Sequence, residues 1–198
     1  PYRWLTVLDP FRSIHPTLLA SNGAVSVDAT TGEVLHDIFM SPTSVAEIIA
    51  DVREALPEAL FCTEEATQWF ADEGFDRWQI GGPPDGEGPI ENFLGGDRRI
   101  VKLLVRTFNF PSDKLFDVVN PIVGDRGTAT FSATMTNGLV EIAAPGVSKG
   151  MALAQVCQDL GIDPSDAAAF GDMPNDLTML ELVGHPYVVS DAHPTLRD

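Results

Sequence analysis

The last third of the chain alternates segments of strand character with segments of helix character, and this order constrains the fold more than any other feature. The run at residues 167–170 is short and wholly apolar, as in a strand buried on both faces. Strand, helix, strand, helix, strand predicts a parallel sheet joined by crossover helices. The predicted elements are strands at 139–142, 167–170 and 187–189 and helices at 149–160 and 176–183. The fold class is therefore α/β.

The middle of the chain mixes strands and helices without strict alternation, which predicts an α+β module. Apolar residues at helical spacing after the capping residues 41–44 indicate a helix that ends before Pro57. Residues 71–97 are rich in Gly, Pro and acidic residues and are expected to form a loop. Trp69 and Trp78 are expected to lie in the core. The other expected elements are a helix at the N-terminus, an extended run at 16–21, a hairpin at 24–35, strands at 60–62, 99–107 and 128–135, and a helix at 111–122.

The composition excludes several classes of protein. Of the 198 residues, 44% are hydrophobic, which is too many for a disordered acidic chain, and no apolar run approaches the ~18–20 residues of a membrane span. The formal charge of −17 argues against nucleic-acid binding, because phosphate backbones are bound by clustered Lys and Arg. Cys62 and Cys157 match no metal-binding or redox spacing and are expected to be reduced thiols of a cytoplasmic protein.

Two loops follow predicted strands at the edge where parallel α/β sheets bind ligands. The first loop, residues 144–150, places Lys149 directly after Ser148, a natural N-cap. An ammonium group at the positive end of a helix dipole costs up to about 1 kcal/mol, and a nearby anion would remove that cost. A solvated lysine whose stem covers the helix end is the commoner arrangement, so this loop alone favours a structural role.

The second loop, residues 170–176, gathers two carboxylates and an amide directly after the buried strand. Capping explains Asn175 or Asp176 singly, and turn formation explains Asp172, but neither explains why all three converge at one strand end. Oxygen ligands of this kind suit Mg²⁺, which usually takes one or two carboxylates, several waters and a substrate phosphate. Together with Lys149 on the neighbouring loop, they predict a phosphate-transfer site.

These residues also carry a family resemblance. The run Gly146-Val147-Ser148-Lys149-Gly150 and the later run Gly171-Asp172-Met173-Pro174-Asn175-Asp176 resemble the third and fourth motifs of the haloacid dehalogenase superfamily. They look most like the Cof-type phosphatases of subfamily IIB. Ser21-Asn22-Gly23-Ala24 is similar to the segment that leads into the family's cap, and Asp191-Ala192-His193-Pro194 stands where members usually have Asn-Ala-His-Pro. The resemblance covers nearly the whole chain.

The resemblance implies a role for each residue of the two loops. Lys149 would be catalytic, holding both the phosphate and the nucleophilic carboxylate. Asp172 would be a catalytic residue that ligates Mg²⁺, and Asp176 would support the same metal site. Asn175 would contact the phosphate. A cation and a fixed lysine are what a phosphoryl group in transfer requires, because its equatorial oxygens must be neutralised.

The resemblance also implies a division into domains. A Rossmann-like parallel-sheet core would comprise residues 1–26 and 137–198, and an α+β cap domain, residues 27–136, would be inserted between them. The cap would exclude water and select the substrate.

The chain departs from the family in its nucleophile. Members carry this aspartate in an Asp-x-Asp-Gly-Thr motif on the first strand, and no Asp-x-Asp occurs in the 198 residues. We therefore expect the chain to be a fragment that is truncated at the N-terminus and lacks the two leading strands of its core. We expect these residues alone to be inactive. Asp191 in place of the family's Asn leaves a changed contact open.

The sequence leaves three functional hypotheses: an enzyme, a binding module and a purely structural domain. In the first, the intact protein is a Mg²⁺-dependent phosphatase of small phosphorylated metabolites such as sugar phosphates, working through an aspartyl-phosphate on the upstream nucleophile. The alternative is a non-catalytic module that binds a phosphate ligand or a metal. A purely structural domain with a capped helix and a surface lysine is the third reading. Nothing in the sequence identifies the substrate, the oligomeric state or a protein partner.

Overall fold

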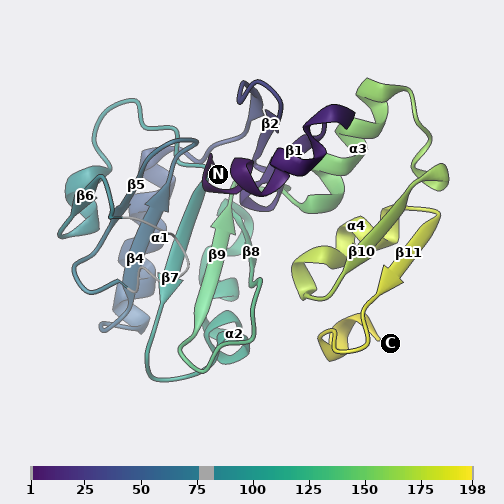
Figure 1. Cartoon of the computed structure of the whole chain (residues 1–198). Helices are drawn as coiled ribbons and strands as arrows, with labels where there is room; N and C mark the ends of the chain where they lie inside the picture. Colours follow the sequence, from purple (N-terminus) through teal and green to yellow (C-terminus); the bar gives the residue numbers. More distant parts are fainter. Residues whose placement is uncertain (1, 76–82, 198) are drawn as a thin grey trace.

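The computed structural model describes residues 2–75 and 83–197. A large sheet backed by two helices lies beside a smaller unit of two strands and two helices, and a three-stranded sheet sits at one end of both (Figure 1). The fold class is α/β, as predicted. No helix among the described residues is both long enough and apolar enough to cross a bilayer. The predicted core position of Trp78 lies outside the described residues.

The large sheet has the strand order β6-β5-β4-β7-β9-β8. All of its neighbours pair antiparallel except β5 and β6, which pair parallel. Part of the segment 71–97, which we expected to be a loop, forms β6 and the 3₁₀ helix η3. The bounds are β4 (Leu60–Glu64), β5 (Trp69–Ala71), β6 (Gly86–Glu87), η3 (Ile90–Phe93), β7 (Lys102–Arg106), β8 (Thr128–Thr130) and β9 (Leu139–Ala143).

The strand β9 corrects the sequence-based prediction. We expected it to open a parallel β-α-β-α-β series, but it pairs antiparallel with β7 and with β8 in the large sheet. Every residue of β9 is buried. A strand buried on both faces is a nearly continuous run of apolar residues in parallel and antiparallel sheets alike. The sequence of β9 therefore did not reveal which sheet it joins.

Two helices, α1 (Pro42–Ala55) and α2 (Ser112–Val123), cover one face of the large sheet (Figure 1). The Ser41 hydroxyl caps α1 by accepting the Ser44 N–H, as the sequence predicted. Alternate strand residues such as Phe61 and Leu103 pack with these helices in the main hydrophobic core. The opposite face carries a second cluster that contains Trp69, which confirms its core position, and it also carries charged side chains.

The N-terminal part forms a 3₁₀ helix, η1 (Tyr2–Ile14), and a three-stranded antiparallel sheet. Its strands are β1 (Thr17–Ala20), β2 (Val25–Asp28) and β3 (Val34–Asp37). The extended run and the hairpin predicted from the sequence therefore pair with each other. A short turn, η2 (Ser21–Gly23), joins β1 to β2 and lies against α3.

The C-terminal part forms the predicted parallel unit. Strands β10 (Ala168–Gly171) and β11 (His185–Val188) pair in parallel register, and the helix α4 (Leu177–Leu182) connects them. The helix α3 (Lys149–Leu160) precedes this unit and has the bounds that the sequence predicted, and Gly161 ends it in the left-handed conformation. The remaining short helices are η4 (Gly124–Arg126), η5 (Pro164–Asp166), η6 (Pro174–Asp176) and η7 (Pro194–Leu196).

Two glycines allow backbone segments to approach unusually closely beside the two predicted loops. A Cβ atom on Gly150, in the first turn of α3, would lie 2.3 Å from the carbonyl oxygen of Thr178 in α4. A Cβ atom on Gly23 would lie 2.5 Å from the carbonyl oxygen of Ser148. These contacts bring η2, α3 and α4 together at one point, so the fold places the start of α3 next to the loop after β10.

We predict that Gly150→Ala destabilises the protein by about 1–3 kcal/mol, because the added methyl group overpacks a backbone contact. The loss should occur even though alanine favours helix over glycine by about 1 kcal/mol. Urea denaturation measures the free energy of unfolding. Gly95→Ala is the matched control, because a Cβ atom there meets nothing within 4 Å. Equal stability of the two variants would refute the close approach.

Candidate functional site

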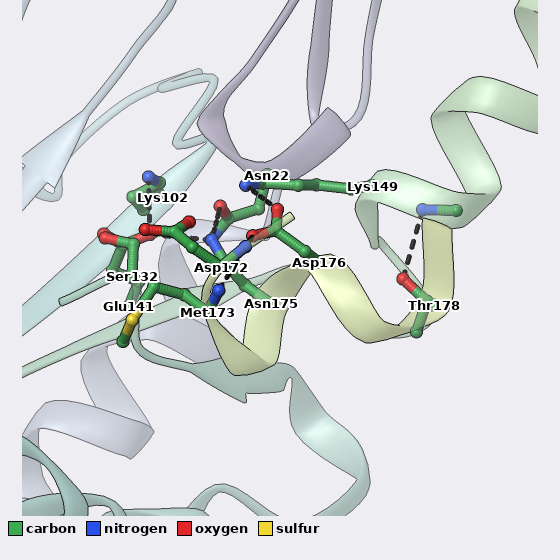
Figure 2. A network of polar contacts seen from close by, with 11 residues as sticks. Asn22, Lys102, Ser132, Glu141, Lys149, Asp172, Met173, Asn175, Asp176 and Thr178 are labelled. Atoms are coloured by element: carbon green, nitrogen blue, oxygen red, sulfur yellow. Dashed lines mark hydrogen bonds and ion pairs between the residues drawn. The ribbon is translucent and has the colours of Figure 1, made fainter. Parts of the chain in front are cut away.

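The predicted site residues lie together at the carboxyl end of β10 and the N-terminus of α3 (Figure 2). Lys149 is the first residue of α3, and Ser148 caps this helix by accepting the Met151 N–H at 3.1 Å. The Lys149 Nζ atom lies 2.5 Å from Asp176 Oδ1. The two loops that the sequence singled out are thus joined by an ion pair.

Asp176 is the buried centre of this arrangement. It is 4% exposed, and its second oxygen, Oδ2, accepts the N–H groups of Asp172 and Met173, each at 3.0 Å. Burial raises the pKa of this carboxyl group, but the hydrogen bonds from Lys149, Met173 and Asp172 outweigh it and hold the pKa below its ordinary value. Asp176 is therefore an anion that fixes both the lysine and the turn after β10.

Asn175 points away from this ion pair into a second set of contacts. It is 9% exposed, and its Nδ2 donates to Asn22 Oδ1 at 3.1 Å. Its Oδ1 atom is buried and has no hydrogen-bond partner among the described residues. An unpaired buried acceptor is unfavourable, and such groups in native structures call for an explanation such as a bound ligand.

Asn22 extends the network to the large sheet. Its Nδ2 donates to Glu141 Oε2, on β9, at 2.7 Å. Ser21, Asn22 and Gly23 all have positive φ angles, of 50°, 59° and 97°. The left-handed conformation costs a non-glycine residue about 1–2 kcal/mol and clusters at functional sites. Sequence reasoning noted Asn22 and Gly23 only as a turn and as part of a family motif, so it missed this bridging role.

A group of charged side chains lies on the face of the large sheet opposite α1 and α2. Glu141 and Lys102 are only 6% and 9% exposed, and Lys102 Nζ lies 2.9 Å from Glu141 Oε2. Ser132 Oγ donates to Glu141 Oε1 at 2.5 Å. Burial raises the pKa of Glu141, but the charge of Lys102 and the hydrogen bonds from Ser132, Lys102 and Asn22 lower it below the ordinary value of 4.5.

The sequence held a signal for this group, which we did not use. Glu141 is the single charged residue of the otherwise apolar strand β9. Lys102 begins the apolar run of β7, and Glu64, at the end of β4, is 5% exposed. Charged residues are almost never buried unless they are paired, so such interruptions indicate a paired cluster. We call Glu64, Lys102, Ser132 and Glu141 the distal cluster.

A cavity of about 360 Å³ connects the distal cluster with the predicted site. Lys149 and Asn175 line one end of it, which we call the phosphate end. Volumes of roughly 300–1,000 Å³ are typical of small-molecule sites. The complete lining is Leu18, Leu19, Ala20, Ser21, Asn22, Glu64, Lys102, Ser132, Glu141, Lys149 and Asn175.

The loop after β10, beside the phosphate end, offers oxygen donors that fit Mg²⁺. Asp172 follows β10 and is exposed, and Asn175 Oδ1 is the unpaired acceptor beside it in the same loop. Both oxygens of Asp176 are engaged by Lys149 and by backbone N–H groups, so this residue suits a supporting place behind a metal. No three His, Cys, Asp or Glu side chains gather as a metal site within the described part of the chain. Mg²⁺ usually completes its shell with water and substrate phosphate.

The motif at residues 191–194 docks onto the same loop. The His193 N–H donates to the Asp172 carbonyl oxygen at 2.7 Å, and the His193 ring packs edge-on against Phe131 with centroids 5.6 Å apart. Asp191, which departs from the family's Asn, is exposed. The backbone of Asp172 is therefore held from two sides, by Asp176 and by His193.

Comparison with known proteins gives consistent matches. The model of the haloacid dehalogenase-like hydrolases matches residues 4–198. The HMP-PP phosphatase of Escherichia coli (strain 55989 / EAEC) is 30% identical over 199 residues, which cover 93% of this chain and 66% of that protein. The chain thus spans just under two thirds of the length of this relative.

Two solved structures have similar folds. SMU.1108c from Streptococcus mutans UA159 superposes with a TM-score of 0.81 at 22% sequence identity. The match covers 100% of this chain and 74% of the SMU.1108c chain. The subclass IIB sugar phosphatase BT4131 has a TM-score of 0.77 at 15% identity, covering 98% of this chain and 71% of its own. At these identities the likeness concerns the fold alone.

We predict that Glu141→Gln destabilises the protein by about 3 kcal/mol near neutral pH, because it removes the carboxylate that pairs with the buried Lys102 Nζ at 2.9 Å. The folded-state pKa of Glu141 lies below 4.5, so the contribution of this carboxylate is complete above that pH and is lost as the pH falls through the folded-state value. The difference between wild type and variant should therefore shrink on acidification below about pH 4.5.

Urea denaturation of both proteins across this pH range measures the difference. Glu47→Gln, on the exposed side of α1, should change the free energy of unfolding by less than about 0.5 kcal/mol at every pH. A gap between wild type and Glu141→Gln that stays constant or widens on acidification would contradict the assigned pKa direction.

Proposed function

Because the chain belongs to the haloacid dehalogenase-like hydrolases, we propose that the protein containing it is a Mg²⁺-dependent phosphatase of small phosphorylated metabolites. The names of similar proteins support this substrate class, since one is an HMP-PP phosphatase and another is a sugar phosphatase. Sugar phosphates are the substrates that we propose first. We place the protein in the cytoplasm, and we infer no nucleic-acid or membrane partner for it.

One observation carries the proposal: the ion pair between Lys149 and Asp176 at the carboxyl end of β10, beside the unpaired oxygen of Asn175. The pair keeps the ammonium group at the phosphate end of the cavity, at the N-terminus of α3. Backbone N–H groups at a helix N-terminus and a fixed ammonium both attract a phosphate group. This arrangement suits anion binding better than a surface lysine would.

In the proposed reaction, Lys149 binds the equatorial oxygens of the transferred phosphoryl group and keeps the nucleophilic carboxylate ionised. Asn175 hydrogen-bonds the phosphate. Asp172 would hold Mg²⁺ with Asp176 behind it, and the ion would supply positive charge that neutralises the phosphate oxygens. The nucleophile would attack phosphorus as the bond to the leaving oxygen breaks, and the leaving oxygen would take up a proton from water. A second water would then hydrolyse the aspartyl-phosphate, which restores the carboxylate and releases inorganic phosphate.

The nucleophilic aspartate has no Asp-x-Asp counterpart within residues 1–198, so the proposal assigns it to sequence outside them. We also propose that residues 1–26 and 137–198 belong to the catalytic core and residues 27–136 to a cap that shields the site from water. In this division β9 completes the sheet of the cap although its residues follow position 136.

The absence of an Asp-x-Asp motif from residues 1–198 fits a second candidate equally well, a non-catalytic module that binds a phosphate ligand or a metal. Lys149, Asn175 and Asp172 would serve such a module equally well, because none of them attacks phosphorus. The coding sequence upstream of Pro1 separates the two candidates. An Asp-x-Asp followed by Gly-Thr on a predicted strand supports the enzyme, and its absence supports the binding module.

We predict that the intact protein hydrolyses p-nitrophenyl phosphate with Mg²⁺ and that Asp172→Ala lowers kcat by at least about a hundredfold. The same substitution should weaken Mg²⁺ binding in calorimetric titration, a readout that does not depend on turnover. Asp125→Ala is the matched control, because Asp125 is an equally exposed aspartate that lies on η4, outside the loops that hold Lys149 and Asp172.

Unchanged turnover and unchanged Mg²⁺ affinity in Asp172→Ala would remove this residue from the site. A wild-type protein that binds Mg²⁺ and inorganic phosphate without turnover would instead establish the binding module.

A further inference from the structure

The distal cluster has no part in the phosphoryl transfer proposed above, although it lines the same cavity. Its members come from three neighbouring strands and the segment before β9, and its three charged side chains are all buried. Burying charged groups costs several kcal/mol per ion unless the groups are paired, and paired clusters often do no better for stability than apolar residues would. Stability alone therefore does not account for this cluster.

The register of the large sheet sets the charge of the cluster. Lys102 stands directly opposite Glu64 in the pairing of β7 with β4, so both side chains lie on the same face of the sheet. Its Nζ atom contacts Glu141 on the other neighbouring strand at 2.9 Å. Lys102 thus has an acidic residue on the same face of each neighbouring strand. The formal charge of the cluster is −1, since one positive and two negative groups contribute.

The cluster is also rich in hydrogen-bond acceptors. Glu141 accepts hydrogen bonds from Asn22, Lys102 and Ser132. A carboxylate offers about four lone-pair sites, so roughly one remains at Glu141. The hydroxyl oxygen of Ser132 keeps its own acceptor sites after it donates to Glu141. A ligand at this end of the cavity would therefore be held by donating hydrogen bonds.

A second observation indicates that a ligand spans the cavity. Asn175 is more than nine-tenths buried, lines the cavity with the distal cluster, and has an Oδ1 atom without a partner among the described residues. Asn22 connects Asn175 to Glu141 through two hydrogen bonds (Figure 2). The phosphate end and the distal cluster are therefore two ends of one continuous site.

We propose that the distal cluster binds the leaving group of the substrate and selects leaving groups that carry hydrogen-bond donors and no second anionic group. This inference rests on the proposed phosphatase function and adds a charge rule to it, by which this protein would discriminate against diphosphates such as the HMP-PP named for its relative. Hydroxyl or amino groups would donate to Glu64 and Glu141. A second phosphate at this end would lie beside a net negative cluster, where like charges repel.

The rule is tested with the intact protein, Mg²⁺ and three phosphate esters. Glucose 6-phosphate has a neutral leaving group with several hydroxyl donors, fructose 1,6-bisphosphate adds a second phosphate, and p-nitrophenyl phosphate reports turnover itself. We expect kcat/KM for glucose 6-phosphate to exceed that for fructose 1,6-bisphosphate by about tenfold or more. A wild-type preference for the bisphosphate overturns the proposal.

Two substitutions should move this preference in opposite directions. Glu64→Gln removes a negative charge and should raise the ratio of bisphosphate to monophosphate kcat/KM by about tenfold, whereas Lys102→Met removes the positive charge and should lower it. Loss of folded protein lowers both rates alike, so it cannot produce opposite shifts in a ratio. The controls are Glu47→Gln and Lys114→Met, which change exposed residues on α1 and α2 and should leave the ratio unchanged. A ratio that Glu64→Gln moves no more than Glu47→Gln does overturns the rule.

Failure of the phosphatase function gives a different result. The wild-type protein would then hydrolyse none of the three esters, and binding would decide the charge rule. In saturating inorganic phosphate, which occupies the phosphate end, calorimetric titration should show glucose binding about tenfold more tightly than glucose 6-phosphate. Equal or tighter binding of glucose 6-phosphate overturns the proposal.

Discussion

The buried carboxylate of Asp176 holds the site in one geometry. One oxygen binds the Lys149 ammonium group, and the other accepts the N–H groups of Asp172 and Met173. None of these groups can shift without leaving a buried charge partly unpaired, which is costly. The glycines beside it make room for this geometry. A Cβ atom on Gly171 would lie 2.6 Å from the Cβ atom of Asp176. Backbone proximity and the ion pair therefore depend on each other.

The turn at Ser21–Gly23 connects this geometry to the large sheet. Its backbone adopts the left-handed conformation at all three positions, which is unfavourable for serine and asparagine. In return, Asn22 bridges Glu141 and Asn175, and Gly23 rests on the cap residue of α3. A strained turn that makes three such contacts is stabilised by its surroundings. This turn therefore connects the polar groups of the large sheet with those of the loop after β10, and both line one cavity.

The net charge of the protein and the charges inside the cavity act on a ligand over different distances. A formal charge of −17 repels anions in general, but at physiological salt this repulsion is screened beyond about 8 Å. A phosphate at the proposed site would therefore have to be attracted by groups in contact with it, and we propose Lys149 and the first turn of α3 for this role. The net negative distal cluster sets a second local field in the same cavity. The proposed discrimination between leaving groups follows because the positive Lys149 end and the net negative distal cluster line the same cavity.

The sequence by itself determined the features that a few neighbouring residues encode. The cap at Ser41, the end of α3 at Gly161, the β10–α4–β11 unit and the two loops that hold Lys149 and Asp176 were all predicted, because caps, glycines and periodicity act within a turn or a strand. Only the tertiary structure decided that β9 joins the large antiparallel sheet, because a strand buried on both faces does not specify its partner. It also brought Asn22 to Glu141 and Asn175, which lie 119 and 153 positions away along the chain. Contacts at such separations depend on how whole sheets and helices pack, and no local pattern carries that information.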